Sequence, residues 1–333
     1  MRIPAANIIL AVGTEPEPEG MIEFSTAQEK FLAHLQSKSK ITKGYVSDDT
    51  QRTYRRGLEC FWVYITQAGA PGLERVSPDH MRAYLESLRD RSQAPATIAL
   101  QRVILKSFFK WASGCYKHID DITQDIEGVR PNRSESPHMT WVQVSSLLDY
   151  LWKDAKARKR DAILFEILAR TGARVAEAAH LDLDSVAITD TTIEISLLGK
   201  GNKHRAITLQ SSPGDPSEGI ARFRSRLEEY LRKRARRPAA PGHEEALFLT
   251  NLGNRIRPRN IQAAFDYYRQ HLNLQAFTPH SLRHAYITRL LQLGVDVATV
   301  AKLAGHSSPN ITLSVYAHTD PGRLLTAAAK AFD

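Results

Sequence analysis

The stretch from Lys117 to His138 constrains the fold most strongly, because it separates two regions that are rich in apolar residues. It combines Gly128, Pro131 and Pro137 with two serines and an asparagine, and it holds few apolar side chains. Such a composition is typical of a boundary between domains. The length of 333 residues agrees with about two domains of roughly 100–200 residues each. We therefore predict a flexible acidic tail (1–21), a first domain (22–116), a linker (117–138) and a second domain (139–333).

The first domain is predicted to be a compact unit of four helices. Its apolar residues recur at the spacing of helices that bury one face. The first of these helices is predicted to end at about Gln36. A proline in the first helical turn loses no hydrogen bond, because the N–H groups of that turn have no partner inside the helix. The residues that mark the four starts are Ser25, Asp48 or Asp49, Ser77-Pro78 and Pro95.

The second domain is predicted to be mainly helical with a small sheet. A helix begins near Trp141, and the strongly apolar run Ala162–Ala169 forms a second helix that ends at Gly172. Residues Thr192–Leu197 alternate between apolar and polar as a strand does, and Arg205–Leu209 is the return strand of a hairpin. The remainder has helical patterning. The predicted fold class is therefore mainly α with a small β-sheet.

The composition favours a partner that carries phosphate groups. The formal net charge is +9 and the isoelectric point is about 9.5. These values suit nucleic acid, although many soluble proteins are mildly basic. Two cysteines, Cys60 and Cys115, are too few for a disulfide framework or a Cys-rich zinc site, so we predict buried free thiols in a reducing cytoplasm. No apolar run approaches the ~20 residues of a membrane helix, so no membrane partner is expected.

Arg174 is a candidate for binding an anion. It follows the predicted helix end at Gly172 and opens the next helix. A guanidinium offers two parallel donors to a phosphate and keeps its charge. Glu177 lies three residues later on the same helix face, where an ion pair could orient the guanidinium. The alternative is an ordinary surface ion pair.

His280 and Arg283 form a second candidate anion site. Thr278-Pro279 is typical of a helix start, and residues three apart share one face of a helix. The N-terminus of a helix favours an anion, because its backbone N–H groups point outward. The alternative is a metal pair formed by His280 and His284. A neighbouring Arg283 would repel a metal cation, and no carboxylate completes a His-Glu-x-x-His pattern.

Lys200 lies between two glycines at the tip of the predicted hairpin, in a loop that could close on a substrate. A lysine ammonium can act as a general acid when neighbouring cations lower its pKa. The alternative for this tip is an ordinary turn.

His306 and Tyr316 follow one another near the C-terminus. Asp296 caps a helix that Gly305 ends, so His306 lies at a helix exit, and Ser308-Pro309 starts a short helix that carries Tyr316. A phenol has a pKa near 10 and is a poor nucleophile at neutral pH. A cluster of positive groups would favour the phenolate and would stabilise a pentacoordinate phosphorus.

Five phrases occur in a fixed order along the second domain. They are Thr-Gly-Ala-Arg (171–174), Gly-Lys-Gly-Asn-Lys (199–203), His-Ser-Leu-Arg-His (280–284), Gly-His (305–306) and Val-Tyr-Ala-His (315–318). These phrases resemble the tyrosine recombinase (phage integrase) family and are Xer-like, and the resemblance runs from about Ser25 to the C-terminus. The spacing from His306 to Tyr316 is ten residues, one more than in familiar members of the family. The residues that match the catalytic set of the family are Arg174, Lys200, His280, Arg283, His306 and Tyr316.

The resemblance implies a helical core-binding (SAM-like) domain and a catalytic domain that form a C-shaped clamp on double-stranded DNA. It implies that Tyr316 attacks the scissile phosphate to form a 3′-phosphotyrosyl bond, that Lys200 protonates the departing 5′ oxygen, and that His306 binds a non-bridging oxygen. Strand exchange would pass through a Holliday junction in a homo-tetramer on DNA, in the cytoplasm, without cofactor, ATP or metal. A short apolar segment, 324–332, would dock on a neighbouring subunit.

Further basic residues are predicted to contact DNA, although each could equally lie on a solvated face. They are Arg52, Arg55, Arg56, Arg102 and Lys106 in the first domain, and Lys203, His204, Arg205 and Arg257, with Arg255 and Arg259 close by, in the second. Lys203 is also the rival of Lys200 as general acid. Two other functions stay open: a type IB topoisomerase, against which the four-helix first domain argues, and a catalytically inert accessory protein, against which the complete catalytic set argues.

Overall fold

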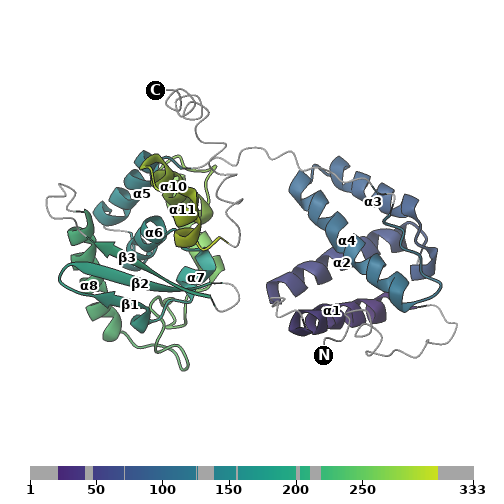
Figure 1. Ribbon diagram of the computed structural model, residues 1–333, viewed down its shortest axis with the longest axis horizontal. Coiled ribbons are helices and arrows are strands. Elements are labelled where there is room, and N and C mark those ends of the chain that lie inside the picture. Colours follow the sequence, from purple (N-terminus) through teal and green to yellow (C-terminus); the bar gives the residue numbers. More distant parts are fainter. Residues whose placement is uncertain are drawn as a thin grey trace, which may run out of the picture. The chain divides into compact units, whose positions relative to one another are not determined.

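The computed structural model describes residues 22–41, 48–70, 72–124, 126, 139–154, 157–199, 203–210 and 219–306, without the side chains of 38–41 and 203. The chain separates into two compact units, Met1–Ser134 and Glu135–Asp333. The described part of the first unit is helical, and the second unit combines helices with a small sheet (Figure 1). The predicted fold class, mainly α with a small β-sheet, is confirmed.

The described part of the first unit contains four helices, which begin within one residue of the predicted signals, although Ser25 lies inside the first helix and does not cap it. They are α1 (Phe24–Ile41), α2 (Asp48–Gln67), α3 (Pro78–Asp90) and α4 (Pro95–Cys115), with one 3-10 turn, η2 (Leu73–Arg75). The Oγ of Ser77 caps α3 by accepting the backbone N–H of His80 at 3.4 Å. The first helix continues beyond the predicted end at Gln36, since neither glycine nor proline interrupts it before Ile41.

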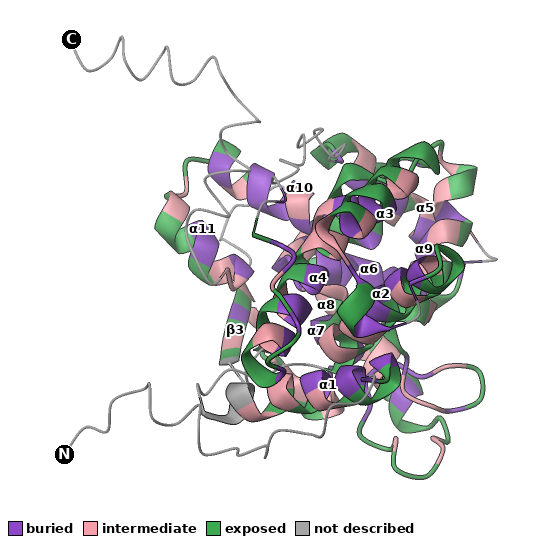
Figure 2. Cartoon of the chain, turned by 90° about the vertical axis from the view of Figure 1, so that its right-hand side faces the viewer, coloured by how far each residue is buried: buried purple, intermediate pink, exposed green. Residues whose placement is uncertain are grey.

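Aromatic side chains fill the core of the first unit. Phe31 and Phe108 meet edge to face, with ring centroids 5.4 Å apart and planes at 85°. Phe61 and Phe109 make a similar contact at 6.0 Å and 90°. This arrangement places the positive edge of one ring on the negative face of the other. Along these helices, buried residues gather on one face and exposed residues on the other (Figure 2).

The core of the first unit continues past Tyr116, where the predicted first domain ends. Ile119, Ile122 and Ile126 are buried against it. The Nε of Arg102 donates to the carbonyl of Ile126 at 3.2 Å and so ties this segment to α4. Isolated isoleucines in a polar stretch give little periodic signal, which is why the sequence pattern resembled a linker.

Cys60 and Cys115 are free thiols, but both are exposed, so the predicted burial was wrong. Cys60 directly precedes the fully buried Phe61 in α2. Consecutive residues of a helix point about 100° apart, so a buried neighbour does not imply a buried thiol.

The second unit is organised around a buried helix. Its described helices are α5 (Trp141–Lys153), α6 (Lys159–Thr171), α7 (Val175–Ala179), α8 (Gly219–Ala235), α9 (Pro258–His271), α10 (Pro279–Gln292) and α11 (Val297–Ala304), with one 3-10 turn, η3 (Leu183–Ser185). Every residue from Ala162 to Ala169 is buried, because α6 packs against α5, α8 and α10. No helix in the described ranges is long and apolar enough to cross a membrane.

In the described residues, three antiparallel strands form a sheet in the order β1 (Val186–Ile188), β2 (Thr192–Gly199) and β3 (Lys203–Gln210). The strands β2 and β3 form the predicted hairpin, whereas β1 has three residues and is too short to show alternation. The register pairs Gly199 with Lys203 at one end of the hairpin.

Candidate active site

Gly172 turns the chain from α6 toward Arg174. It has a left-handed conformation, with φ of 60° and ψ of 22°, which favours glycine at a helix end. A Cβ atom at this position would lie 2.3 Å from Cδ1 of Tyr286, so a larger residue would displace that ring. The turn makes Arg174 the N-cap residue of α7.

Glu177 holds two arginines at once. Its carboxylate accepts the backbone N–H of Arg174 at 2.7 Å and Nη1 of Arg174 at 2.8 Å. The same carboxylate accepts Nη1 of Arg205 at 2.9 Å and Nη2 at 2.7 Å. Burial opposes ionisation of Glu177, but the hydrogen bonds from Arg205 and Arg174 outweigh it and lower the pKa below its usual range. The carboxylate is therefore ionised, and the three side chains together carry one net positive charge.

Arg283 is more deeply buried than Arg174. Its side chain in α10 is buried, and Nη1 donates to the carbonyl of Gly172 at 2.6 Å. Burial, and then the nearby Arg174, lower the pKa of Arg283 to about 10. The guanidinium therefore remains charged at neutral pH, although it has lost much of its hydration.

Three arginines hold the C-terminal end of α11. The Nε of Arg205 donates to the carbonyl of Leu303 at 3.1 Å, Nη2 of Arg283 to Ala304 at 2.5 Å, and Nη2 of Arg174 to Gly305 at 2.8 Å. The last carbonyls of a helix have no partner inside it, and the helix dipole makes this end negative. The arginines satisfy these carbonyls, and they come from three segments that are far apart in the sequence.

Two histidines flank this arginine cluster. His280 lies at the exposed edge, in the first turn of α10, and His306 directly follows Gly305. Partial desolvation lowers the pKa of each histidine to about 4; the charges of His284 and Arg283 add to this at His280, and those of Arg283 and Arg174 at His306. Both rings are therefore neutral at pH 7, and each can donate its N–H to an anion.

The metal alternative finds little support in the described residues. The rings of His280 and His284 meet edge to face at 4.7 Å. Within the described ranges, no group of three His, Cys, Asp or Glu side chains is gathered as metal ligands. The cationic Arg283 contributes a charge that opposes a bound cation.

The structure thus brings together Arg174, His280, Arg283 and His306 from the predicted catalytic set. Lys200 and Tyr316 lie outside the described residues, and so does the side chain of Lys203. The backbone of Lys203 begins β3, and the side chain of His204 is exposed beside it.

Arg205 differs from its predicted role as a DNA contact. Its side chain is 13% exposed, and its guanidinium is committed to Glu177 and Leu303. The alternation of buried and exposed residues along β3 could have predicted the burial of Arg205. Residues two apart on a strand share a face, and Ile207 is buried, so Arg205 points into the same interior.

The basic residues of the first unit fall into two groups. Arg52 forms an ion pair with Asp49, and Arg55 forms one with Glu29. Arg102 donates a hydrogen bond to the carbonyl of Ile126. Arg56 and Lys106 are exposed on α2 and α4, and the side chain of the paired Arg52 is exposed as well.

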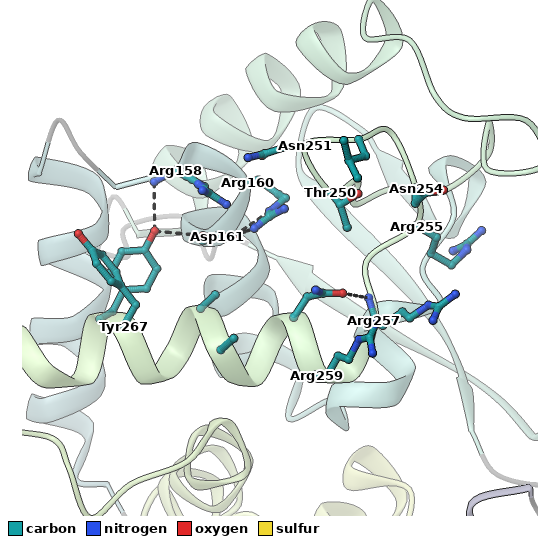
Figure 3. Close-up of a pocket in the computed structure, with 15 residues that line it drawn as sticks. Arg158, Arg160, Asp161, Thr250, Asn251, Asn254, Arg255, Arg257, Arg259 and Tyr267 are labelled. Atoms are coloured by element: carbon teal, nitrogen blue, oxygen red, sulfur yellow. Dashed lines mark hydrogen bonds and ion pairs between the residues drawn. The ribbon is translucent and has the colours of Figure 1, made fainter.

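An arginine-lined cleft of about 860 Å³ lies beside the start of α9 (Figure 3). Two of its arginines are held by neighbouring groups: Arg160 bonds to Asp161 at 2.7 Å, and Nη1 of Arg255 donates to the carbonyl of Leu181 at 3.1 Å. The exposed arginines of the cleft are Arg158, Arg257 and Arg259. The exposed arginines of the cleft could therefore bind an anion that approaches from solvent.

Comparison with known proteins agrees with this geometry. Residues 137–323 match the phage integrase family, and residues 29–114 match the phage integrase N-terminal SAM-like domain. The chain belongs to the phage integrase family.

Two curated relatives are similar over almost their whole length. The tyrosine recombinase XerC of Herpetosiphon aurantiacus is 31% identical over 297 residues, which cover 89% of this chain and 91% of that protein. The tyrosine recombinase XerC of Corynebacterium efficiens is 30% identical, with coverages of 96% and 94%.

Solved structures share the fold. The XerH site-specific recombinase, bound to a palindromic difH substrate in a post-cleavage complex, has a TM-score of 0.74 and 21% identity, with coverages of 96% of this chain and 100% of that one. A lambda integrase dimer bound to a core site has a TM-score of 0.64 and 16% identity, with coverages of 86% and 96%.

Proposed function

We propose that this protein is a site-specific DNA recombinase that cuts and rejoins DNA strands through a bond between Tyr316 and a 3′-phosphate. One observation supports the proposal above others. Arg174 and Arg283 come from helices far apart in the sequence, and both bond to the end of α11, from which the chain continues to His306 and Tyr316. Two guanidiniums therefore lie at the end of the helix that precedes His306, which supports their proposed role in binding the phosphate.

The chemistry follows from the charges of these groups. Tyr316 loses its phenolic proton to water, and its oxygen attacks phosphorus. The bond between phosphorus and the 5′ oxygen breaks, and Lys200 gives that oxygen a proton. Arg174 and Arg283 stabilise the added negative charge, and preorganised donors of this kind are among the largest contributions to catalysis. His280 and His306, which are neutral at pH 7, donate hydrogen bonds to the non-bridging oxygens.

The second half of the reaction reverses the first. A 5′-hydroxyl of a partner strand attacks the phosphorus and gives its proton to Lys200. The bond between phosphorus and the Tyr316 oxygen breaks, and Tyr316 regains a proton from water. The number of phosphodiester bonds is unchanged, so ATP is not consumed. Two such exchanges lead into and out of a Holliday junction.

The proposed partner is duplex DNA. The complexes of XerH with difH and of lambda integrase with its core site support this choice. We propose that both units contact the duplex, through Arg56 and Lys106 in the first and through His204, Arg257 and Arg259 in the second. Assembly into a tetramer on DNA, in the cytoplasm, completes the proposal.

A covalent trap tests the function. Nicked fragments of genomic DNA from the source organism would be incubated with the protein, and the adducts would be isolated under denaturing conditions and sequenced. We expect a specific adduct with the native chain and none with Tyr316→Phe, which should still bind the same DNA. Binding without an adduct in the native chain would support the inert accessory protein. Relaxation of supercoiled DNA without recombinant products would support the topoisomerase.

A further inference from the structure

All three nitrogens of the Arg205 guanidinium donate to protein groups. The Nη1 and Nη2 atoms bond to the two oxygens of Glu177 at 2.9 and 2.7 Å, and Nε bonds to the carbonyl of Leu303 at 3.1 Å. This paired geometry is the strongest form of arginine–carboxylate contact. Arg205 therefore joins β3 to α7 and to α11.

Arg174 is held in a different way. Its side chain is 38% exposed, and its Nη1 shares the oxygen Oε1 of Glu177 with Arg205. If Arg174 were the sole partner of Glu177, the carboxylate would cancel its charge. With Arg205 present, the carboxylate is already neutralised, and Arg174 retains positive charge for an incoming phosphate.

Arg205 also packs closely against the exit of α11. Gly305 has a φ of 67°, and a Cβ atom there would lie 2.9 Å from Nη1 of Arg205 and 3.1 Å from its Cζ. Glycine therefore lets the guanidinium approach the turn that leads to His306. Arg205 also lies two positions after Lys203 on β3, and Lys203 is paired with Gly199 at the end of the hairpin.

We propose that Arg205 is a positioning residue for the recombination reaction, which compensates the charge of Glu177 so that Arg174 can bind the scissile phosphate, and which fixes the end of α11. The inference rests on the proposed function and names a new participant in it. A direct contact with DNA is the competing role. That role would require Arg205 to leave Glu177 buried without its main partner.

The test compares single and double variants on the DNA sequence recovered from the covalent trap. Arg205→Gln should slow adduct formation at saturating DNA by on the order of tenfold to hundredfold, as for a weakened charge stabiliser. The dissociation constant and its salt dependence should change little. Arg205→Lys should recover part of the rate, since it keeps the charge but loses the paired geometry.

The double variant Glu177→Gln/Arg205→Gln gives the decisive readout. Removing the carboxylate removes the uncompensated charge, so the double variant should form adduct faster than Arg205→Gln alone. A simple loss of stability would not be repaired in this way. A 5′-bridging sulfur substrate should not rescue Arg205→Gln, because the defect lies at Arg174 and not in protonation of the leaving group.

Control variants separate the outcomes. Arg232→Gln removes one exposed charge from α8 and should leave both rate and affinity unchanged. Additive losses of rate in the double variant would overturn the inference. It would also be overturned if Arg205→Gln bound DNA more weakly but had a normal rate at saturating DNA, with a salt slope reduced by about 0.9 per lost phosphate contact. Absence of an adduct with the native chain would instead refute the proposed function.

Discussion

Arg283 and Gly172 are 111 positions apart, yet the Nη1 of Arg283 donates to the Gly172 carbonyl at 2.6 Å. The bond connects α10 with the turn that presents Arg174. Arg283 thus supports the turn that carries Arg174, the other arginine proposed to bind the phosphate. This relationship separates the expected effects of the two arginines on catalysis and on stability.

Arg283→Ala and Arg174→Ala should each slow adduct formation about hundredfold or more, because each removes a preorganised charge from the reacting phosphate. Their effects on stability should differ. Arg283→Ala leaves the carbonyls of Gly172 and Ala304 without these donors in the interior, at a cost of about 1–3 kcal/mol for each group that stays unsatisfied. Denaturant unfolding should show this loss for Arg283→Ala and a smaller one for Arg174→Ala. Equal stabilities would mean that water replaces Arg283.

Gly172→Ala should destabilise the second unit by about 1–3 kcal/mol, since it combines an unfavourable backbone conformation with a clash. The added methyl group would meet Tyr286. Gly242→Ala is the matched control, because Gly242 also has a positive φ, of 79°, but nothing lies within 4 Å of its added Cβ. The difference between the two variants, measured by denaturant unfolding, gives the cost of the clash. A further change, Tyr286→Leu, should recover part of it.

The stability of the folded chain should decrease as the pH is lowered, because protonation of His280 and His306 is less favourable in the folded chain than in the unfolded one. The pKa of His280 and that of His306 are each lowered from 6.5 to about 4, so the unfolded chain binds these protons more tightly than the folded one. The stability contributed by the neutral rings is complete above about pH 6.5 and is lost as the pH falls toward 4. Melting temperatures between pH 7.5 and 4.5 should therefore decline less steeply for His280→Gln. The control is His118→Gln, an exposed histidine of the first unit, which should follow the native curve.

The parts of the site that were predictable from sequence depend on local signals. The starts of α10 and α11 lie at Thr278-Pro279 and Asp296, where residues suited to helix N-termini mark them. Arg174 and Glu177 are three residues apart, so one turn of helix brings them together. Such contacts require no knowledge of the tertiary fold.

The remaining contacts depend on packing between distant segments. Arg205 bonds to Glu177, 28 positions away, and Arg283 bonds to Ala304, 21 positions away. Both contacts form only because β3, α7, α10 and α11 pack together. A basic residue in a hairpin looks the same in sequence whether it faces DNA or a buried carboxylate. Burial, which the sequence does not state, distinguishes the two roles for Arg205.

Lys200 and Lys203 can be distinguished by the leaving group. If Lys200 protonates the 5′ oxygen, a substrate with sulfur at the bridging position needs no proton donor, because a thiolate leaves readily. Adduct formation by Lys200→Ala should therefore be slow on the oxygen substrate and near native on the sulfur substrate. Lys203→Ala serves as the paired variant and should show no selective rescue. The reverse pattern would assign the general acid to Lys203.

Removal of the chain after Thr319 should impair assembly without destabilising the monomer. Leu324, Leu325, Ala328 and Phe332 recur at near-helical spacing, so a helix there would have one apolar face. A short terminal helix gains little from its own hydrogen bonds, because nucleation is costly, and needs a surface on which to bury that face. If that surface belongs to a neighbouring subunit, the truncated protein should keep its melting temperature and its binding to one half-site but lose the tetrameric complex and strand exchange. Calorimetry and sedimentation on the same truncated protein measure both properties. A destabilised monomer that still assembles and recombines would show that the segment packs on its own subunit.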